Sequence, residues 1–434
     1  MKYTAPRGTK DILPDDSSIW QVVENVCRAV FGLYNYQEIR TPIFEPTELF
    51  ARSIGDSTDI VKKEMYTFAD RKGRSLTLRP EATAAVVRAG LENNLISTDN
   101  LTKLYYIGPM FRYERPQAGR QRQFNQAGIE AFGSNDPLLD AEVIQMAVKL
   151  FETLGLKELE VDVNSVGCKK CRPVYLEALK KYFQENIKHM CEDCKARFET
   201  NPLRILDCKE EPCQKYIAKA PAMVDHLDPE CKDHFEKVVG WLGGLGVKFK
   251  INDRLVRGLD YYTKTAFEVV SKRLGAQNAV CGGGRYDDLV EELGGKPTPA
   301  IGFAIGLERL IEVLKSENKQ QGMGHRIDLF IATIGDEARK VGFDLLTKAR
   351  ISGVRADTDY LGKSLKAQMK AADRLKAHYV YIIGEEELKK KSAMLKNMET
   401  ADQKEVPFDQ LFKDTGCDCG DDCKCSCEDD GCCD

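Results

Sequence analysis

Hydrophobic positions near the start of the chain repeat with helical spacing. In residues 17–34, apolar side chains recur every three or four positions from Ile19 to Leu33, which places them along one face of a helix. The next stretch, residues 36–46, has the pattern of an extended chain that contains two prolines. Because proline has no N–H to donate to a strand ladder, we expect this strand to lie at a sheet edge or at an interface.

Two strand-like stretches, residues 104–114 and 123–133, flank a polar loop rich in Arg and Gln. This pattern predicts a long antiparallel hairpin, followed by a helix over residues 136–155. Side chains alternate between the two faces of a strand, so Arg112 and Glu114 should share one face of the first strand. One face of the second strand should carry Phe124, Gln126, Gly128 and Glu130.

Residues 168–245 differ in character from the segments on either side. They are rich in Cys, Lys and Glu and contain helical runs, which predicts an inserted, mostly helical subdomain. Strand-like segments resume at residues 255–270 and again near residue 279. The insertion therefore interrupts a domain that continues after it.

A strand with small residues on one face precedes a helix within residues 298–315. Gly302, Ala304 and Gly306 alternate along this strand and leave one face nearly bare. A bare face lets a flat ring or another backbone come close, although close packing of strand and helix explains the small residues equally well. Arg309 stands at the start of the helix.

After a linker at residues 322–326, apolar strands alternate with amphipathic helices. The expected strands are residues 327–334, 353–359, 378–384 and 393–398, and the expected helices are residues 336–351 and 362–377. This alternation favours a small α/β domain with a partly parallel sheet. Residues 413–434 contain almost no core-forming side chains and should be disordered without a ligand.

The composition is that of a globular protein with a polar surface. The chain has 434 residues, of which 42% are hydrophobic and 30% charged, a length that suggests roughly two or three domains. No apolar stretch approaches the ~20 residues that span a bilayer, and the N-terminal segment lacks the apolar core of a secretory signal. We therefore expect a cytoplasmic protein without a membrane partner. A net charge of −4 provides no global basic field, so any RNA contact must come from local clusters.

Cysteine is abundant and clustered. Of the 16 cysteines, seven lie in the predicted insertion and seven in the last 18 positions. In a cytoplasmic chain, such clusters indicate metal or redox sites before disulfides. Two C-x-x-C pairs in the insertion have spacing that suits a tetrahedral structural zinc site, and free reduced thiols explain them equally well. The candidate ligands are Cys168, Cys171, Cys191 and Cys194, with Cys208 and Cys213 as substitutes.

The hairpin and its loop carry the residue types of a site for a small zwitterion beside a phosphate. Arg120 lies in the loop with two further arginines, and arginine forks suit phosphate oxygens. Arg257, Tyr261 and Tyr262 lie along a later predicted strand, where one tyrosine should pack and the other should line a pocket. Each pattern alone is also typical of an ordinary solvated surface.

Taken together, these segments resemble the class II aminoacyl-tRNA synthetases, and specifically the histidyl-tRNA synthetase family. Residues 105–133 look like the second motif that defines the class, and residues 300–310 look like the third. Residues 257–269 look like a peptide peculiar to the histidine enzyme. The helix from residue 17 and the strand at Pro42 look like the first motif, which forms the dimer interface in this class. The similarity extends from residue 1 to about 412.

The resemblance implies roles for individual residues. Arg112 and Arg257 match two arginines on either side of the ATP α-phosphate and carry the implied catalytic role. The implied histidine-binding residues are Glu81, Thr83, Arg112, Gln126, Glu130, Arg257, Tyr261 and Tyr262. The implied ATP-binding residues are Arg112, Glu114, Arg120, Phe124 and Arg309. Ala82 departs from the family, which usually has glycine there, and we expect only slight crowding from its methyl group.

The resemblance also implies a fold and an activity. The implied α+β fold is an antiparallel sheet flanked by helices, in a catalytic domain over residues 1–322 with a helical insertion at about 168–245. An α/β anticodon-binding domain would follow at residues 326–412. The implied reaction is ATP-dependent ligation of L-histidine to tRNA(His) through histidyl-adenylate, with Mg²⁺ accompanying ATP, in a homodimer.

Three alternatives remain open. A catalytically silent, histidine-sensing regulatory paralogue would lack the phosphate-binding arginines and the anticodon domain. Another class II synthetase would lack the block around Tyr261 and Tyr262. A protein that only binds RNA would have no ATP-type site, and an amino-acid-dependent pyrophosphate exchange assay separates it from an enzyme.

Overall fold

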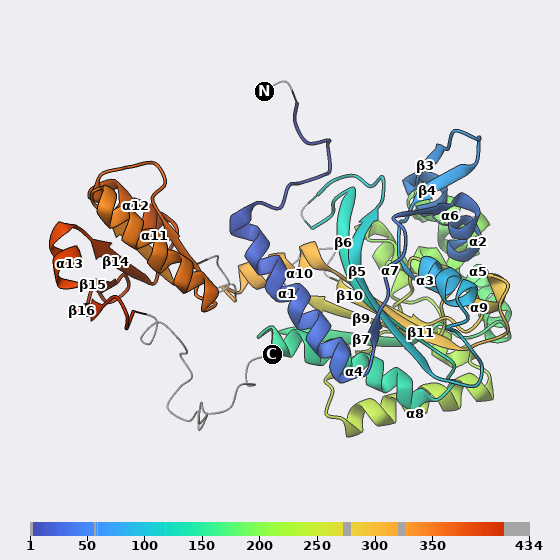
Figure 1. The fold of residues 1–434 in the computed structure, drawn as a ribbon. Coiled ribbons are helices and arrows are strands. Elements are labelled where there is room, and N and C mark those ends of the chain that lie inside the picture. Colours follow the sequence, from blue (N-terminus) through green and yellow to red (C-terminus); the bar gives the residue numbers. More distant parts are fainter. Residues whose placement is uncertain are drawn as a thin grey trace. The chain divides into compact units, whose positions relative to one another are not determined.

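The computed structural model describes residues 3–55, 58, 60–117, 119–271, 279–319 and 326–411 (Figure 1). Contacts within the chain divide it into two compact units, Met1–Met323 and Gly324–Asp434. The segment predicted to be disordered, 413–434, and most of the predicted linker lie outside the described residues. Among the described helices, none is both long and apolar enough to cross a membrane.

An eight-stranded sheet forms the centre of the first unit in the described part of the chain. In order across the sheet, its strands are β1 (Gln37–Glu38), β5 (Thr102–Phe111), β6 (Gln123–Phe132), β11 (Ala300–Gly306), β10 (Ala279–Arg285), β9 (Thr263–Ser271), β7 (Leu159–Ser165) and β8 (Phe249–Ile251). The pairs at the two edges are parallel, and the pairs between them are antiparallel. β5 and β6 form the long hairpin predicted from the sequence.

Helices cover one face of this sheet and bury its apolar residues. The helices that contribute to this core are α1 (Pro14–Leu33), α4 (Pro137–Thr153), α8 (Pro229–Gly244) and α10 (Leu307–Ser316). Ile129 of β6 and Phe303 of β11 point into it. Because side chains alternate along a strand, Gln126 and Glu130 of β6 point to the opposite face. That second face carries the cavity described below.

Smaller elements surround the second face. They are a three-stranded sheet of β2 (Phe44–Pro46), β4 (Ser75–Leu78) and β3 (Tyr66–Ala69), helices α2 (Thr47–Ile54), α3 (Thr83–Glu92) and α9 (Leu289–Glu292), and a π-helical turn at Ile60–Glu64. The expected edge position of the proline-containing segment is confirmed. Its strands β1 and β2 each lie at an edge of their sheet, and Pro46 is the last residue of β2.

The cysteine-rich insertion is helical, as predicted. Its elements are α5 (Cys171–Asn186), α6 (Glu192–Thr200), α7 (Glu211–Ile217) and short 3₁₀ turns at Ile187–His189, Pro202–Asp207 and Met223–His226. These elements bury a core of their own, which extends as far as Cys231. Helix α8 instead packs on α4, where Phe235 and Val238 join the main core. The last part of the predicted insertion, residues 229–244, therefore belongs structurally to the core beneath the sheet.

The second unit alternates strands and helices as expected. Its sheet has the order β13 (Ala356–Thr358), β12 (Leu329–Thr333), β14 (Tyr379–Ile383), β15 (Ser392–Asn397) and β16 (Gln403–Pro407), with helices α11 (Asp336–Ile351), α12 (Leu365–Arg374) and α13 (Glu385–Lys390). The first three strands are parallel and the last two antiparallel, so the predicted partly parallel sheet is confirmed. Sequence analysis missed α13 and β16, which are short and largely polar.

In the large sheet, β5 and β9 do not cover the full ranges predicted for them. β5 ends at Phe111 because the chain turns there: the Glu114 N–H donates to the Arg112 carbonyl over 2.8 Å. β9 begins only at Thr263. Arg257 therefore lies in a loop, and the expectation that residues 255–262 form a strand was wrong.

Candidate active site

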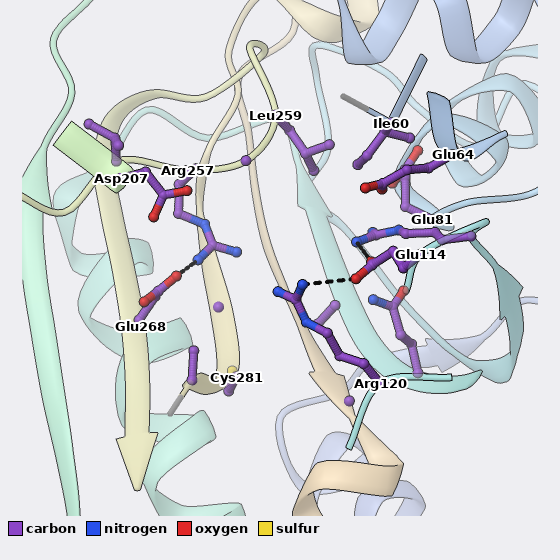
Figure 2. Close-up of a pocket in the computed structure, with 18 of the residues that line it drawn as sticks. Ile60, Glu64, Glu81, Glu114, Arg120, Asp207, Arg257, Leu259, Glu268 and Cys281 are labelled. Atoms are coloured by element: carbon purple, nitrogen blue, oxygen red, sulfur yellow. Dashed lines mark hydrogen bonds and ion pairs between the residues drawn. The ribbon is translucent and has the colours of Figure 1, made fainter. Parts of the chain in front are cut away.

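A cavity of about 540 Å³ lies on the second face of the large sheet, bordered by residues of β5, β6, β10 and β11 (Figure 2). Residues far apart in the sequence border it, because the hairpin, the loop before β9 and the start of α10 converge there. The predicted site residues that line this cavity are Glu81, Thr83, Arg112, Glu114, Arg120, Phe124, Gln126, Glu130, Arg257, Tyr261, Tyr262 and Arg309. The structure thus brings every predicted histidine-binding and ATP-binding residue to one place.

The inner end of the cavity contains a buried carboxyl group, that of Glu130. Its Oε1 accepts a hydrogen bond from the Thr83 hydroxyl at 2.7 Å, and its Oε2 accepts one from the Tyr286 hydroxyl. Burial raises the pKa of Glu130 to about 8 because the charged form loses its hydration. Gly302 lies directly opposite on β11, and a Cβ there would overlap Glu130 Oε2. The bare strand face seen in the sequence therefore makes room for this carboxyl group.

A second carboxylate, Glu81, lies two residues before the start of α3. Its oxygens accept hydrogen bonds from the backbone N–H groups of Thr83, at 2.7 Å, and Ala84, at 3.0 Å. These N–H groups are otherwise unpaired at a helix start, so the carboxylate caps the helix. Burial nevertheless raises the pKa of Glu81. Ala82 is buried in the adjoining apolar cluster, so its methyl group is accommodated.

Three tyrosines enclose the space beside Glu130. The ring centres of Tyr261 and Tyr262 are 4.8 Å apart, and that of Tyr286 is 5.6 Å from Tyr261. Tyr261 and Tyr262 are both buried and both border the cavity. The expectation that one would pack and the other would line the pocket was wrong, because the two residues precede β9 and do not alternate as strand residues do.

Arginines border the outer part of the cavity. Arg120 Nη1 lies 2.9 Å from Glu114 Oε2 (Figure 2). Arg112 Nη1 lies 3.8 Å from Glu114 Oε1. Arg112 Nε also donates to the Pro80 carbonyl at 2.8 Å, and its guanidinium lies 5.3 Å from the centre of the Phe124 ring. Arg112 and Glu114 thus meet as predicted, although a turn and not a strand brings them together.

Arg257 is fixed by an ion pair with Glu268 of β9 and lies over the Tyr262 ring, 5.5 Å from its centre. Burial by itself would lower the pKa of Arg257, but the neighbouring carboxylate outweighs it, so the pKa is raised. The guanidinium therefore stays charged. Gly282 leaves the space that this side chain fills, because a Cβ there would overlap the guanidinium.

Arg309, the third residue of α10, completes the set. Its Nη1 donates to the Ala279 carbonyl at 2.7 Å and its Nε to the Gly119 carbonyl at 3.3 Å. Burial, with a further contribution from the positive charge of Arg120, lowers the pKa of Arg309. Bringing a polyanion into this space would relieve the repulsion between the arginines.

Two buried polar atoms at the cavity have no hydrogen-bond partner among the described residues: Gln126 Oε1 and Arg257 Nε. A buried polar group without a partner costs about 1–3 kcal/mol. Such atoms are typical of a site that a polar ligand completes. They lie on the residues that sequence analysis had selected for substrate contact.

Comparison with known proteins identifies the family. Residues 8–310 match the family model described as Histidyl-tRNA synthetase, and residues 328–414 match that described as Anticodon binding domain. The histidine–tRNA ligase of Halothermothrix orenii is 53% identical over 414 residues, which cover 95% of this chain and 99% of that protein. The corresponding ligase of Desulforamulus reducens is 52% identical over 411 residues, covering 95% and 98%. The solved apo structure of S. aureus histidyl-tRNA synthetase shares 42% identity with a TM-score of 0.79 and covers 95% of this chain and 99% of that one.

This chain belongs to the histidyl-tRNA synthetase family. The regulatory-paralogue alternative required a chain without phosphate-binding arginines and without an anticodon domain. Arg112, Arg257 and Arg309 share the cavity, and the second unit matches an anticodon-binding domain. That alternative is therefore not favoured.

Sequence analysis of this synthetase family member missed several residues that line the cavity or hold its side chains, among them Tyr286, Glu268 and Tyr106. Tyr286 holds Glu130, Glu268 holds Arg257, and Tyr106 of β5 lies opposite Gly128 and lines the cavity. Strand alternation could have found Tyr106, which faces the same side as Gly108. Glu268 and Tyr286 carry no local signal, because their roles arise only when β9 and β10 pair beside the loop.

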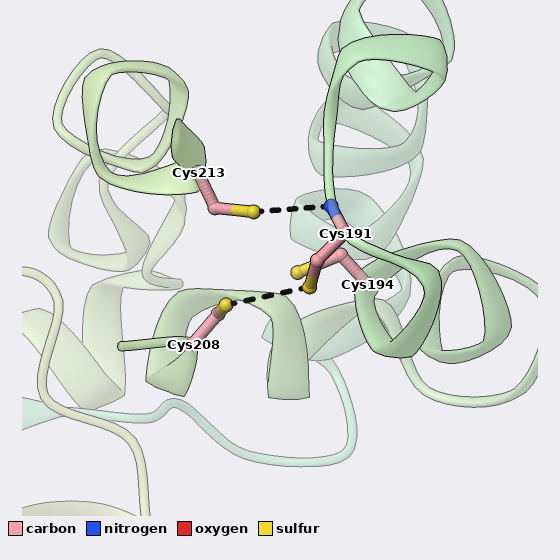
Figure 3. Close-up of side chains that lie close together, drawn as sticks. All are labelled: Cys191, Cys194, Cys208 and Cys213. Atoms are coloured by element: carbon pink, nitrogen blue, oxygen red, sulfur yellow. Dashed lines mark hydrogen bonds between the residues drawn. The ribbon is translucent and has the colours of Figure 1, made fainter. Parts of the chain in front are cut away.

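The cysteines of this synthetase do not form the predicted site. Cys191 and Cys194 lie with Cys208 and Cys213 (Figure 3), whereas the other C-x-x-C pair lies with an aspartate and a later cysteine. The structure therefore does not bring Cys168, Cys171, Cys191 and Cys194 into a single group, whereas the predicted substitutes Cys208 and Cys213 do lie with Cys191 and Cys194. Cys191 and Cys194 meet the residues that follow the Pro202–Asp207 turn, whereas Cys168 and Cys171 meet the chain only at the far end of the insertion, at Asp228 and Cys231.

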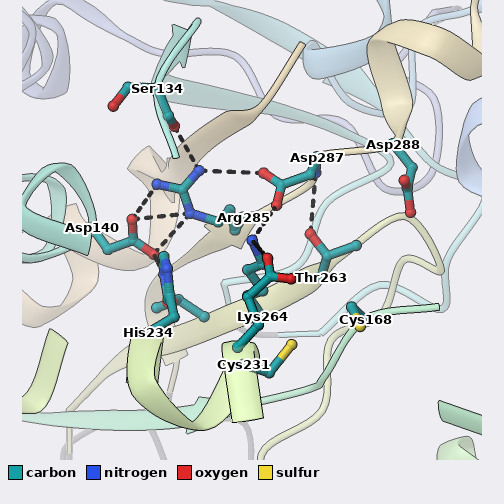
Figure 4. A network of polar contacts seen from close by, with 12 residues as sticks. Ser134, Asp140, Cys168, Cys231, His234, Thr263, Lys264, Arg285, Asp287 and Asp288 are labelled. Atoms are coloured by element: carbon teal, nitrogen blue, oxygen red, sulfur yellow. Dashed lines mark hydrogen bonds and ion pairs between the residues drawn. The ribbon is translucent and has the colours of Figure 1, made fainter. Parts of the chain in front are cut away.

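A buried charge network anchors the strand ends near the cavity (Figure 4). Arg285 is fully buried and pairs with Asp140 of α4, which also lies 3.0 Å from His234 Nε2 of α8. Lys264 bridges Asp287, on the β10 side, and Glu230, next to the insertion, at 3.4 Å each. The network thus connects α4, α8, β9 and β10 immediately behind Tyr286.

Proposed function

We propose that this chain activates L-histidine with ATP to form histidyl-adenylate and pyrophosphate, and then transfers the histidyl group to tRNA(His), releasing AMP. The observation that carries this proposal is the cavity itself. Its outer part holds Arg112, Arg257 and Arg309, and its inner part holds Glu130 among buried tyrosines. A site of this kind fits a triphosphate beside a small polar ring.

The inner part would bind histidine. The imidazole ring has two nitrogens, and Glu130 with the Tyr261–Tyr262 pair supplies polar groups that can hydrogen-bond to both. Gln126, with its unpaired Oε1, faces the same space. Glu81 and Thr83 would hold the amino group and backbone of the amino acid. Amino acids without two ring nitrogens would leave these buried groups unpaired, which is the physical basis of selectivity.

The outer part would bind ATP, which enters as its Mg²⁺ complex. Arg112 and Arg257 would flank the α-phosphate, and Arg309 would lie near the γ-phosphate. The Phe124 ring offers a flat surface for the adenine base, and Arg120 would cover the nucleotide from the hairpin loop. Glu114 supplies carboxylate oxygens of the kind that suit Mg²⁺.

The chemistry requires orientation and charge more than proton transfer. One oxygen of the histidine carboxylate attacks the α-phosphorus, a P–O bond forms, and pyrophosphate leaves with the electron pair of the bond that breaks. The carboxylate is already ionised at neutral pH, so no general base is required in this step. Arg257, held by Glu268 before substrate arrives, would stabilise the charge that develops on the phosphate oxygens.

In the second step, a ribose hydroxyl at the 3′ end of tRNA(His) attacks the histidyl carbonyl and AMP leaves. The arginine-rich loop between β5 and β6 would meet the acceptor stem, which its border on the same cavity supports. The second unit would bind the anticodon. Charged tRNA is consumed by ribosomes, so we propose a cytoplasmic location for this activity.

We also propose a homodimer. The chain segment around α1 exposes several large apolar side chains, which are Ile12, Leu13, Leu33, Ile43 and Phe44. These residues lie at both ends of α1 and at the start of β2, and exposed apolar side chains of this size are typical of a protein interface. Analytical ultracentrifugation should give twice the chain mass, and a monomer at micromolar concentration would contradict the proposal.

The test of the proposed function is ATP–pyrophosphate exchange measured with each of the twenty amino acids in turn. We expect exchange that depends on histidine and on no other amino acid. Exchange with a different amino acid would overturn the substrate assignment. No exchange with any amino acid would overturn the activity.

A further inference from the structure

We propose that the insertion holds two zinc ions, each bound by four side chains. The first site consists of Cys191, Cys194, Cys208 and Cys213, and the second consists of Cys168, Cys171, Asp228 and Cys231. In each group, the possible ligand atoms all lie within 4.8 Å of one another. Sequence spacing alone had suggested one ion, and the fold supplies the missing ligands for a second.

The distances between the sulfur atoms fit a single ion in each group. Zinc bonds sulfur at about 2.3 Å in a tetrahedron, which sets neighbouring sulfurs about 3.8 Å apart. Cys191 Sγ lies 3.8 Å from Cys208 Sγ, and Cys168 Sγ lies 3.6 Å from Cys171 Sγ. A disulfide needs about 2.05 Å between sulfurs. An iron–sulfur cluster places several atoms between its thiolates and so separates them further.

Backbone groups are aimed at the sulfur atoms in both sites. The Cys191 N–H donates to Cys213 Sγ at 3.2 Å (Figure 3), and the Lys170 N–H donates to Cys168 Sγ at 3.3 Å. The Asp228 N–H donates to Cys171 Sγ at 3.2 Å. A zinc ligand is a thiolate, and such N–H groups stabilise its negative charge. Most of these thiols are also buried, as in closed structural zinc sites.

The insertion is small, and cysteine occupies an unusual share of its core. Five of the 14 buried residues in that core are cysteines, so aliphatic side chains alone make a poor interior. A segment of this size commonly depends on cross-links or a metal for stability. Zinc binding would supply that stability, because the ligands come together only in the folded chain.

The two sites are placed at different levels of the insertion. The second site joins the two ends of the insertion. Cys168 and Cys171 follow β7, Asp228 directly precedes α8, and Cys231 lies in its first turn. Figure 4 shows Cys168 and Cys231 beside the charge network. The first site lies further along, where the start of α6 meets the residues after the Pro202–Asp207 turn.

The first site also connects to the cavity. The Pro202–Asp207 turn lies between Cys194 and Cys208, and Arg204 of this turn donates from Nη1 to the Arg257 carbonyl at 3.0 Å. Cys191 and Cys208 border the cavity as well. The first zinc would thus hold the turn that braces the Arg257 loop. This positioning role rests on the proposed function, whereas the presence of zinc does not.

The test measures metal content in the full chain. The seven tail cysteines are replaced by serine in a full-length variant, because they would otherwise bind metal themselves. We expect this parent to retain two zinc ions per chain by mass spectrometry. Cys213→Ser and Cys231→Ser in the parent should each lose one, and Cys27→Ala, in α1 outside both sites, should retain two.

If a cysteine variant fails to fold, the parent still decides the matter. Protein produced with cobalt in place of zinc should show the strong visible absorption of tetrahedral thiolate-bound cobalt. Zinc near zero, iron in its place, or two zinc ions in every variant would overturn the proposal. Histidine-dependent exchange is measured on the same parent. If exchange is absent while two zinc ions are present, the proposed function is wrong and the zinc proposal stands.

Discussion

The arginine-lined cavity and the cysteine-rich insertion lie in the same unit but are built in opposite ways. Around the cavity, strands such as β5 and β6 pair over their full length, and the register fixes which side chains meet. In the insertion, short helices and 3₁₀ turns replace the sheet, and groups of thiols lie where the chain returns. Backbone pairing in the sheet therefore positions the charged side chains of the cavity. In the insertion, contacts between side chains position the thiol groups.

This difference predicts different responses to substitution. In the cavity, backbone pairing maintains the fold when a charged side chain is removed, so the rate should change more than the stability. In the insertion, removal of one ligand should affect metal content and stability together. The following variants test this contrast, starting with the largest expected effect.

Arg112→Ala should lower histidine-dependent exchange by ~10²–10³-fold, because one cation at the transferring phosphate is lost. The midpoint of thermal unfolding should change by only a few degrees, since Arg112 is not part of the main core. Steady-state exchange and calorimetry measure the two effects.

The control for this variant is Arg122→Ala. Arg122 lies in the same loop but stacks on Tyr113, with its guanidinium 3.8 Å from the ring centre, and does not line the cavity. Its loss should leave exchange nearly unchanged. Equal losses in the two variants would mean that loop folding and not phosphate contact is being measured.

Glu130→Gln should lower kcat/KM for histidine by roughly 10- to 100-fold, because a buried hydrogen-bonding group is altered. The same variant should be more stable than the wild type at alkaline pH. Burial raises the pKa of Glu130 from 4.5 to about 8, so the folded protein retains a proton that the unfolded chain releases. The resulting stabilisation is fully present below pH 4.5 and is lost as the pH rises to about 8.

Glutamine remains uncharged at every pH, so the stability gained by the variant should grow between these pH values. The increase should be on the order of a few kcal/mol. Urea unfolding at several pH values measures it. If the difference in unfolding free energy between variant and wild type does not change with pH, the pKa of the Glu130 carboxyl group is not raised.

Arg204→Ala should lower exchange by about tenfold, since a charge-assisted hydrogen bond to the Arg257 carbonyl is removed. Zinc content should stay the same, because Arg204 is not a ligand. Lys195→Ala is the matched control: Lys195 lies on α6 and pairs with Glu192 at the surface. Loss of zinc in Arg204→Ala would contradict the claim that Arg204 supports the Arg257 loop without taking part in zinc binding.

Ending the chain at residue 415 should have the smallest effect. The cysteine-rich tail has no counterpart in the family pattern, so aminoacylation should be unchanged within measurement error. Kinetics of tRNA charging with the full and shortened chains measure this. A marked loss would show that the tail takes part in substrate handling.

Much of the fold was predictable because its elements carry strong periodic patterns. The amphipathic α1, the β5–β6 hairpin and the alternating second unit all match their expected segments within a few residues. The short α13 and β16 were missed because polar residues dominate them and leave no periodicity to detect.

The site was predictable as a set of residues but not as a geometry. Resemblance to a family selected the residues that now line one cavity, whereas the partners that fix them come from other strands. The role of Glu268 follows only from the pairing of β9 with β10, and the role of Tyr286 follows only from its hydrogen bond to Glu130. The cysteine groups were not predicted for the same reason. Sequence spacing identifies each C-x-x-C pair, but the fold of the insertion determines which other residues lie beside it.

The most direct test separates binding from chemistry in Arg257→Ala. Histidine affinity is measured by calorimetry, and the rate of adenylate formation is measured in a single turnover with ATP in excess. We expect near-normal histidine affinity with adenylate formation slowed by ~10²–10³-fold. A near-normal rate of adenylate formation would contradict the assignment of this arginine to the phosphate.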